Sequence, residues 1–216
     1  MLRGLVSRTS RSADVWVALS RQGAALWASC GGPQVSMSIV LPEGLDRPKV
    51  TVAERRGSGA PLAIVGELTY KRLIVLETAI DLIRREVPSY EVDIIGVQRP
   101  PAPGRRYHGC IPHPQVLELM ASASVTVFPS AVESFGLPAF EATALGRPCV
   151  VDERSSMHEW LQDRVVTFDG TAEDLARALQ SRTWGPQEPE RRFLWENAVN
   201  AWEEALVRAA SGSAPR

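Results

Sequence analysis

Cysteine is scarce in this sequence, and its few residues form no recognisable metal or redox pattern. The chain has three, Cys30, Cys110 and Cys149, with no Cys-x-x-Cys pair and none of the His/Cys spacing of a zinc site. This pattern argues against a structural zinc and favours a reducing compartment. Because Cys110 and Cys149 flank β-like segments, we expect both to be small core residues. The sequence predicts no metal site.

An excess of charge of either sign is also missing. With 25 acidic and 24 basic residues the formal net charge is −1, so the charge balance favours neither nucleic acid nor an anionic membrane surface as a partner. No apolar run approaches the roughly 18 residues that a membrane helix requires, and no signal peptide is visible. We expect no transmembrane segment and a cytoplasmic location, with peripheral contact at the inner face of the membrane left open.

Short strands and amphipathic helices alternate along the chain from Ala60 onward. This alternation is typical of βαβ units around a mostly parallel sheet, so it predicts an α/β fold with a doubly wound, Rossmann-like sheet. We expect strands at residues 62–65, 92–95, 107–111, 125–128, 148–152 and 165–168. We expect helices at residues 73–85, at 114–123, from 138 to before 146, near 158, from 172 onward and along a final segment after 194. Trp195 and Trp202 on this last helix are expected to pack in the core.

Residues 124–150 carry most of the functional information. They place Glu133 on a loop and Glu141 on the helix that follows, which starts near Pro138 and closes at Gly146. The first backbone N–H groups of a helix have no partner within it, and the helix dipole favours negative charge there. The start of this helix is therefore a predicted anion site, and phosphate suits it best.

The two carboxylates suit the groups that flank a diphosphate. An ionised carboxylate only accepts hydrogen bonds, which matches the vicinal hydroxyls of a sugar or a ribose. Glu141 follows Leu137 by four residues, about 6 Å along the helix axis, while Glu133 lies on the loop before it. A nucleotide-sugar has this order of groups: ribose, diphosphate, sugar.

The spacing of Glu133 and Glu141, with Phe135-Gly-Leu-Pro138 between them, resembles the signature of GT-B fold glycosyltransferases of family 4, the glycosyl transferases group 1. Members of that family are mostly retaining and metal-independent, so the resemblance implies no cofactor besides the nucleoside-diphosphate sugar donor. It covers nearly the whole chain, but only the C-terminal, donor-binding half of the GT-B architecture. Most of the N-terminal acceptor domain is expected to be missing.

The resemblance implies a role for each matching residue. Glu133 is expected to be catalytic, contacting the donor sugar and supporting the transition state. The backbone amides of Phe135, Gly136 and Leu137 are expected to hold phosphate or sugar oxygens. Glu141 is expected to hold the ribose.

The loop after the first strand of the main sheet departs from the family pattern. Lys71, or alternatively Arg72, matches the lysine that holds the departing diphosphate, but Glu67 stands in place of the family's arginine. A carboxylate there would repel the developing charge, which argues against ordinary catalysis. Arg72 or an arginine of residues 98–106 would have to compensate.

Three further matches concern less distinctive segments. The stretch around Gly109, Cys110 and Ile111 resembles the family segment whose backbone contacts the nucleotide base, so these residues are assigned to the base pocket. Glu159 falls where the family often has a sugar-contacting glutamate, although the preceding glycines are missing and an ordinary helix residue is an equal reading. Glu43 stands where the interdomain crossover of the family usually has Asn.

The expected domains are a remnant of the acceptor-type domain with the crossover (residues 1–50), the nucleotide-sugar-binding domain (51–185), and a C-terminal helix with a disordered tail (186–216). The N-terminal remnant would then expose an apolar face, which favours a homodimer or a partner chain. This face includes Val15, Val17, Leu19 and Leu26.

Two functions remain open at this point. The first is a glycosyltransferase whose donor-binding half is this chain, acting on an acceptor that is a glycan, a lipid or a small molecule. The second is a non-catalytic or split-subunit module that binds a nucleotide-sugar and needs an acceptor domain on a partner chain. A nucleotide-sugar epimerase is more distant, because the sequence shows no acid/base set for it.

Overall fold

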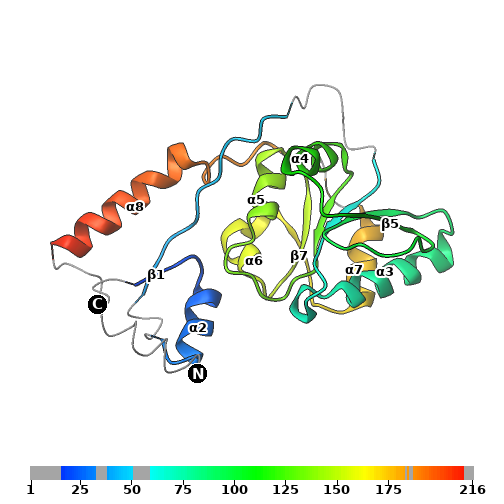
Figure 1. Cartoon of the computed structure of the whole chain (residues 1–216), viewed down its shortest axis with the longest axis horizontal. Coiled ribbons are helices and arrows are strands. Elements are labelled where there is room, and N and C mark those ends of the chain that lie inside the picture. The colour runs from blue at the N-terminus through cyan, green and yellow to red at the C-terminus, as the bar shows by residue number, and fades with distance from the viewer. Residues whose placement is uncertain (1–15, 33–37, 51–58, 183, 185–186, 212–216) are drawn as a thin grey trace.

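The computed structural model describes residues 16–32, 38–50, 59–182, 184 and 187–211, and its main body is a six-stranded parallel sheet between helices (Figure 1). The strand order β5-β4-β3-β6-β7-β8 confirms the doubly wound α/β fold. The strands are β3 (Leu62–Ile64), β4 (Val92–Ile95), β5 (Arg105–Gly109), β6 (Thr126–Phe128), β7 (Cys149–Asp152) and β8 (Val166–Phe168).

Helices cover both faces of this sheet, which is why its central strands are continuous buried apolar runs. One face packs against α3 and α7 and the other against α4, α5 and α6, as Figure 1 shows on the two sides of β7. The bounds are α3 (Leu73–Glu86), α4 (His113–Ser122), α5 (Leu137–Ala144), α6 (Ser156–Leu161) and α7 (Ala172–Ser181), with short 3-10 helices at η3 (Thr69–Lys71) and η4 (Gln162–Arg164).

The edge strand β5 differs from the prediction of residues 107–111. It begins at Arg105, which pairs with Val92, and it ends at Gly109, whose positive φ of 64° turns the chain out of the sheet. Cys110 follows this turn and is exposed, so its expected place in the core was wrong. Cys149 is buried as expected, and burial raises the pKa of its thiol to about 12.

The N-terminal segment forms a separate βαβ unit. β1 (Trp16–Ala18) pairs in parallel with β2 (Ser38–Val40), and α2 (Arg21–Ser29) connects them. Leu26 is exposed as expected, but Leu19 packs against the core of the main body, which corrects the expectation for that residue. Val15 lies outside the described residues.

The last helix, α8 (Trp195–Ala210), lies on the same side of the molecule as β1 and α2 (Figure 1). Trp202 donates from Nε1 to the carbonyl of Pro42 at 2.8 Å, and the Trp195 ring lies directly against Gly44. Trp195 is 45% exposed and Trp202 half-buried, so these tryptophans pack on the crossover and not in the core as predicted. The reason is that α8 leaves the main body after Leu194.

Within the described part of the chain, none of the helices combines the length and hydrophobicity that crossing a bilayer requires. The domain boundaries expected at residues 50 and 185 stay predictions, because residues 51–58 and 185–186 lie outside the described ranges.

Candidate functional site

The order of the parallel strands reverses between β3 and β6. In open α/β sheets, ligands bind at such a switch point, outside the carboxyl ends of the strands. The loops that leave these two ends are residues 65–72, called here the β3 loop, and residues 129–136, called the β6 loop. Both carry predicted site residues, so the fold brings the two parts of the predicted site together.

The two loops line one cavity of about 190 Å³. Within it, Lys71 Nζ of the β3 loop donates to Glu133 Oε1 of the β6 loop at 2.6 Å, and the two side chains are 26% and 18% exposed. Glu43 of the crossover also lines the cavity, and among the described residues nothing donates to its carboxylate or forms an ion pair with it. The cavity thus combines one ammonium with two carboxylates.

The β6 loop is anchored in the core by an aromatic side chain. Phe135 is buried and stacks on Phe140 with ring centroids 3.9 Å apart, while the edges of Trp160 and Phe193 meet it. Phe135 was predicted to contact the donor through its backbone amide, and with its ring buried, the amide is the part of the residue left for that role. The stacking fixes the backbone from which this amide projects.

Gly136 is required by geometry at the end of this loop. Its φ is +93°, and a Cβ atom there would lie 2.4 Å from Met157 Cγ. Helix α5 then begins at Leu137, so Pro138 is its second residue and not its first as predicted. Gly146 ends the helix as expected, with φ +67° and an amide that donates to Thr143.

The predicted anion site at the start of α5 consists of free donors. Among the described residues, none accepts a hydrogen bond from the backbone N–H groups of Phe135, Gly136 or Leu137. These groups carry the positive end of the helix dipole and lie beside the Lys71–Glu133 pair. The arrangement can hold an anion, although anion binding itself stays a prediction.

Three side chains outside the predicted site hold the β6 loop in place. Gln22 of α2 accepts at Oε1 from the amides of Glu133 (3.2 Å) and Ser156 (3.3 Å). The buried Ser156 hydroxyl donates to the Glu133 carbonyl at 2.9 Å. Ser20 Oγ donates to the Ser134 carbonyl at 2.8 Å. Sequence reasoning missed these contacts because a Gln or Ser in or next to a helix gives no signal of a distant partner.

Glu159 contacts backbone and not the cavity. Its carboxylate oxygens each accept from the amide of Arg21 at 2.9 Å, and one also accepts from Gln22 at 3.4 Å. The carboxylate therefore caps α2 across the molecule and complements its dipole. In this structure Glu159 fixes the N-terminal unit on the main body.

Glu141, the predicted ribose ligand, is the fifth of the eight residues of α5, and among the described residues its carboxylate has one close partner. His113 Nε2 lies 2.7 Å from Glu141 Oε1, and the two side chains are 62% and 16% exposed. His113 is the first residue of α4, and Pro112 separates it from the segment of Gly109, Cys110 and Ile111. The contact therefore brings the residue assigned to the ribose near the segment assigned to the base, and both assignments stay predictions.

Lys71 and Arg72 are neighbours in the chain but point to different partners. Arg72 Nη1 pairs with Asp152 Oδ2 at 2.5 Å, and its other amino group donates to the carbonyl of Gly170. The Asp152 side chain is 0% exposed, and Arg154 also pairs with it at 2.7 Å. The donor contact predicted for Arg72 stays a prediction, whereas the structure gives this guanidinium a buried carboxylate to neutralise.

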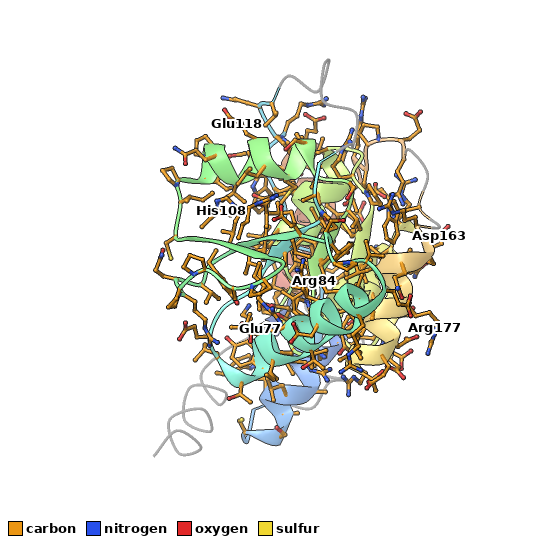
Figure 2. All side chains as sticks on the ribbon, turned by 90° about the vertical axis from the view of Figure 1, so that its right-hand side faces the viewer. Glu77, Arg84, His108, Glu118, Asp163 and Arg177 are labelled. Carbon is orange, nitrogen blue, oxygen red and sulfur yellow. The ribbon has the colours of Figure 1, made fainter. Side chains whose placement is uncertain are left out.

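Glu67 is exposed at the start of the β3 loop. Arg99 Nε lies 3.7 Å from its Oε1, and Arg99 Nη1 lies 3.5 Å from Glu77 Oε1 on α3. Figure 2 shows Glu77 on the part of α3 that faces the viewer. Tyr107 donates to Glu77 at 2.7 Å, and burial together with this hydrogen bond raises the pKa of Tyr107 to about 12. An arginine of residues 98–106 therefore does lie beside Glu67.

Across the described ranges, no group of three or more His, Cys, Asp or Glu side chains is arranged to hold a metal ion.

Comparison with known proteins connects this geometry to one family. The sequence profile of the family described as Glycosyl transferases group 1 matches residues 59–182. Glycogen synthase of Mycobacterium tuberculosis is 26% identical over 210 residues, covering 84% of this chain and 51% of that protein. O-antigen chain mannosyltransferase B of Escherichia coli is 31% identical over 113 residues, 45% of this chain and 30% of that protein. The match to the glycogen synthase includes most of this chain but only about half the length of that protein.

Solved structures show the same fold at low sequence identity. The crystal structure of Anabaena HepE in complex with UDP-glucose superposes with a TM-score of 0.72 at 16% identity, covering 98% of this chain and 67% of that one. Sucrose-phosphate synthase from Thermosynechococcus elongatus superposes with a TM-score of 0.69 at 18% identity, covering 98% and 61%. These likenesses place the whole described chain in a GT-B type architecture.

Proposed function

Because this chain belongs to the glycosyl transferases group 1 family, we propose that it binds a nucleoside-diphosphate sugar and supports transfer of the sugar to an acceptor. The observation that carries the proposal is the cavity at the switch point, where the Lys71–Glu133 pair lies beside the start of α5. The names of the relatives, which include a mannosyltransferase and a UDP-glucose complex, favour a hexose donor. The acceptor remains a glycan, a lipid or a small molecule.

The diphosphate is proposed to bind between Lys71 and the amides of Phe135, Gly136 and Leu137. Departure of the nucleoside diphosphate leaves negative charge on its phosphate, and an ammonium with oriented N–H groups stabilises that charge without a metal. The free amides need no reorganisation for this purpose. Metal independence is thus proposed from the donor set of this chain.

Glu133 is proposed to be the catalytic residue. In the structure its carboxylate neutralises Lys71. A bound diphosphate would accept hydrogen bonds from the Lys71 ammonium and so weaken its pairing with Glu133. The Glu133 carboxylate could then accept from the sugar hydroxyls and stabilise positive charge at the anomeric carbon. Retention of configuration is proposed from family membership alone, and the anomeric proton coupling of the product decides it.

A second candidate is a module that binds the nucleotide-sugar without transferring it by itself. It rests on Glu67 and Glu43, which bring negative charge to the β3 loop and to the cavity. In that reading an acceptor domain on a partner chain completes the enzyme, or transfer does not occur.

Calorimetric titration with UDP, GDP, ADP and their glucose or mannose esters tests the donor site. We expect one nucleotide to bind in the micromolar range and Glu141→Ala to weaken it by at least about tenfold, which corresponds to about 1.4 kcal/mol. Glu118→Ala is the matched control, because Glu118 is an exposed glutamate on α4 at the outer edge of the molecule (Figure 2). A folded wild-type chain that binds none of these compounds contradicts the proposal.

Slow hydrolysis of the bound nucleotide-sugar, with water as acceptor, separates the two candidates. If the chain is catalytic, wild type releases free sugar and Glu133→Gln keeps binding but loses release. Hydrolysis that is absent from wild type and present after addition of a partner chain favours the split module. Equal hydrolysis by wild type and Glu133→Gln removes the catalytic role of Glu133.

A further inference from the structure

Glu141 has a neighbour that none of the predicted roles includes. We propose that His113 is a positioning residue for nucleotide binding: its Nε2–H holds one oxygen of Glu141, so that the other oxygen is presented to the ribose. This inference rests on the proposed role of Glu141 in donor binding.

The first support is the hydrogen bond itself. His113 Nε2 and Glu141 Oε1 are 2.7 Å apart, the length of a strong charge-assisted bond. A carboxylate only accepts, so Nε2 carries the proton in this arrangement. Within the described residues, His113 is the one group that donates to the Glu141 carboxylate. Without it, no described residue would donate to this carboxylate and fix its orientation.

The second support is the backbone that carries the imidazole. His113 stands between Pro112 and Pro114 at the first position of α4. Proline fixes its own φ, so the chain on both sides of His113 has little freedom. The backbone from which this 62% exposed imidazole projects is thereby restricted, and the hydrogen bond to Glu141 orients the ring.

The third support is the location of the pair. The Glu141 side chain is only 16% exposed, so a ligand reaches it from few directions, and His113 occupies one of them. A carboxylate offers about four acceptor positions on two oxygens, so one bond to His113 leaves room for ribose hydroxyls. His113 also follows Ile111 by two residues, which joins the ribose carboxylate to the segment assigned to the base. The pair pre-organises the nucleoside half of the site.

The opposite role makes an opposite prediction. If His113 merely filled the place of the ribose, it would compete with the nucleotide, and its removal would tighten binding. If His113 positions Glu141, its removal weakens binding. The sign of the change therefore distinguishes the two.

The test is calorimetric titration of wild type, His113→Ala, His113→Gln and Glu141→Ala with UDP, GDP and ADP and with their 2′-deoxy and 3′-deoxy forms. We expect His113→Ala to weaken the nucleotide that binds by about tenfold, the loss typical of a hydrogen bond to a charged group. His113→Gln, which keeps an N–H donor, should recover most of this loss. Loss of a ribose hydroxyl should cost wild type several-fold and His113→Ala much less.

Two controls separate positioning from a general effect on the fold. His108→Ala removes another His–carboxylate contact of 2.7 Å, to Asp93, and should leave nucleotide affinity unchanged. Inorganic pyrophosphate, which has no ribose, should bind wild type and His113→Ala equally.

Unchanged or tighter nucleotide binding by His113→Ala overturns the inference, as does an equal loss of pyrophosphate binding. When Glu141→Ala weakens binding and His113→Ala does not, the inference fails and the proposed donor site stands. A wild-type chain that binds no nucleotide overturns both.

Discussion

The two loops that line the cavity are built in opposite ways. The β6 loop is fixed by the buried ring of Phe135 and by hydrogen bonds from other elements, including Gln22 and Ser156. The β3 loop exposes Leu68 at 60% and is held mainly at its end, through Lys71 and Arg72. The difference teaches that the β6 loop supplies a shape fixed by packing and hydrogen bonds, whereas the β3 loop supplies charged side chains from a more exposed backbone.

Exchange of the glycine in each loop for alanine tests this contrast, and it carries the largest expected effect. In Gly136→Ala the new methyl meets Met157 and the residue keeps a positive φ, so we expect a loss of about 3 kcal/mol in the free energy of unfolding and loss of nucleotide binding. In Gly66→Ala the nearest atom to the new Cβ is Lys71 Cγ at 3.6 Å, an ordinary contact. That variant should stay within about 0.5 kcal/mol of wild type.

Urea unfolding measures the change in stability of each variant, and calorimetric titration with the nucleotide that wild type binds measures the change in affinity. Equal stability of the two alanine variants would show that the backbone at Gly136 is no more constrained than the backbone at Gly66.

The next largest effect separates the adjacent cations of the β3 loop. Arg72→Met removes one of two cations from the fully buried Asp152, so we expect a loss of about 2 kcal/mol in stability. Lys71→Met leaves Glu133 partly open to water, so its stability should change by less than about 1 kcal/mol. The affinity of Lys71→Met for the nucleoside diphosphate should fall by about tenfold or more.

Thermal melts of the two variants measure the change in stability, and calorimetric titration measures the change in nucleotide affinity. If Lys71→Met is the less stable variant and Arg72→Met the weaker binder, the assignment of the two residues must be reversed.

Sequence reasoning predicted the main sheet well because most of its strands are short apolar runs between turn residues, and the strand whose bounds differed, β5, is the polar segment Arg105–Gly109. It located Gly146 and the start of α7 at Ala172, because helix ends depend on neighbouring residues: the side chain of the N-cap Thr171 accepts from the amide of Asp174. It misplaced Cys110, since the strand before it ends at Gly109 through a positive φ that the sequence does not display. Patterns of neighbouring residues therefore predicted which helices and strands form, but they did not predict that β5 ends at Gly109.

The candidate site was predictable where it follows one continuous segment and unpredictable where partners come from afar. Glu133 and Glu141 were identified by their spacing around one helix start. The contact of Gln22 with the amide of Glu133 joins residues more than a hundred positions apart, and no period or motif encodes it. Trp195 was expected in the core because an amphipathic stripe does not say which surface it will meet.

A smaller effect is expected from Gln22, whose amide holds the β6 loop from outside. Gln22→Ala leaves the amides of Glu133 and Ser156 without this acceptor, so we expect a loss of about 1 kcal/mol in stability. Nucleotide affinity should fall several-fold because Glu133 is less well placed. Gln180→Ala is the control, since Gln180 makes one exposed hydrogen bond to Glu86 and should be neutral. Similar chemical denaturation midpoints for both variants would contradict the anchoring role.

The smallest expected effect is a gain, and it concerns the charge of the β3 loop. Glu67→Arg replaces the carboxylate with the arginine that the resemblance to the family implies at this position, and it gives up only a long, exposed contact to Arg99. Affinity for the nucleoside diphosphate should rise by about fivefold at low salt, and the gain should shrink as salt screens the new charge. Glu67→Gln removes the negative charge without adding a positive one, so its gain should be about half as large in free energy. Calorimetry at two salt concentrations measures both variants. Affinities equal to wild type would mean that the exposed β3 loop does not bring residue 67 to the phosphate, and that shape from the β6 loop and charge from Lys71 are sufficient for the site.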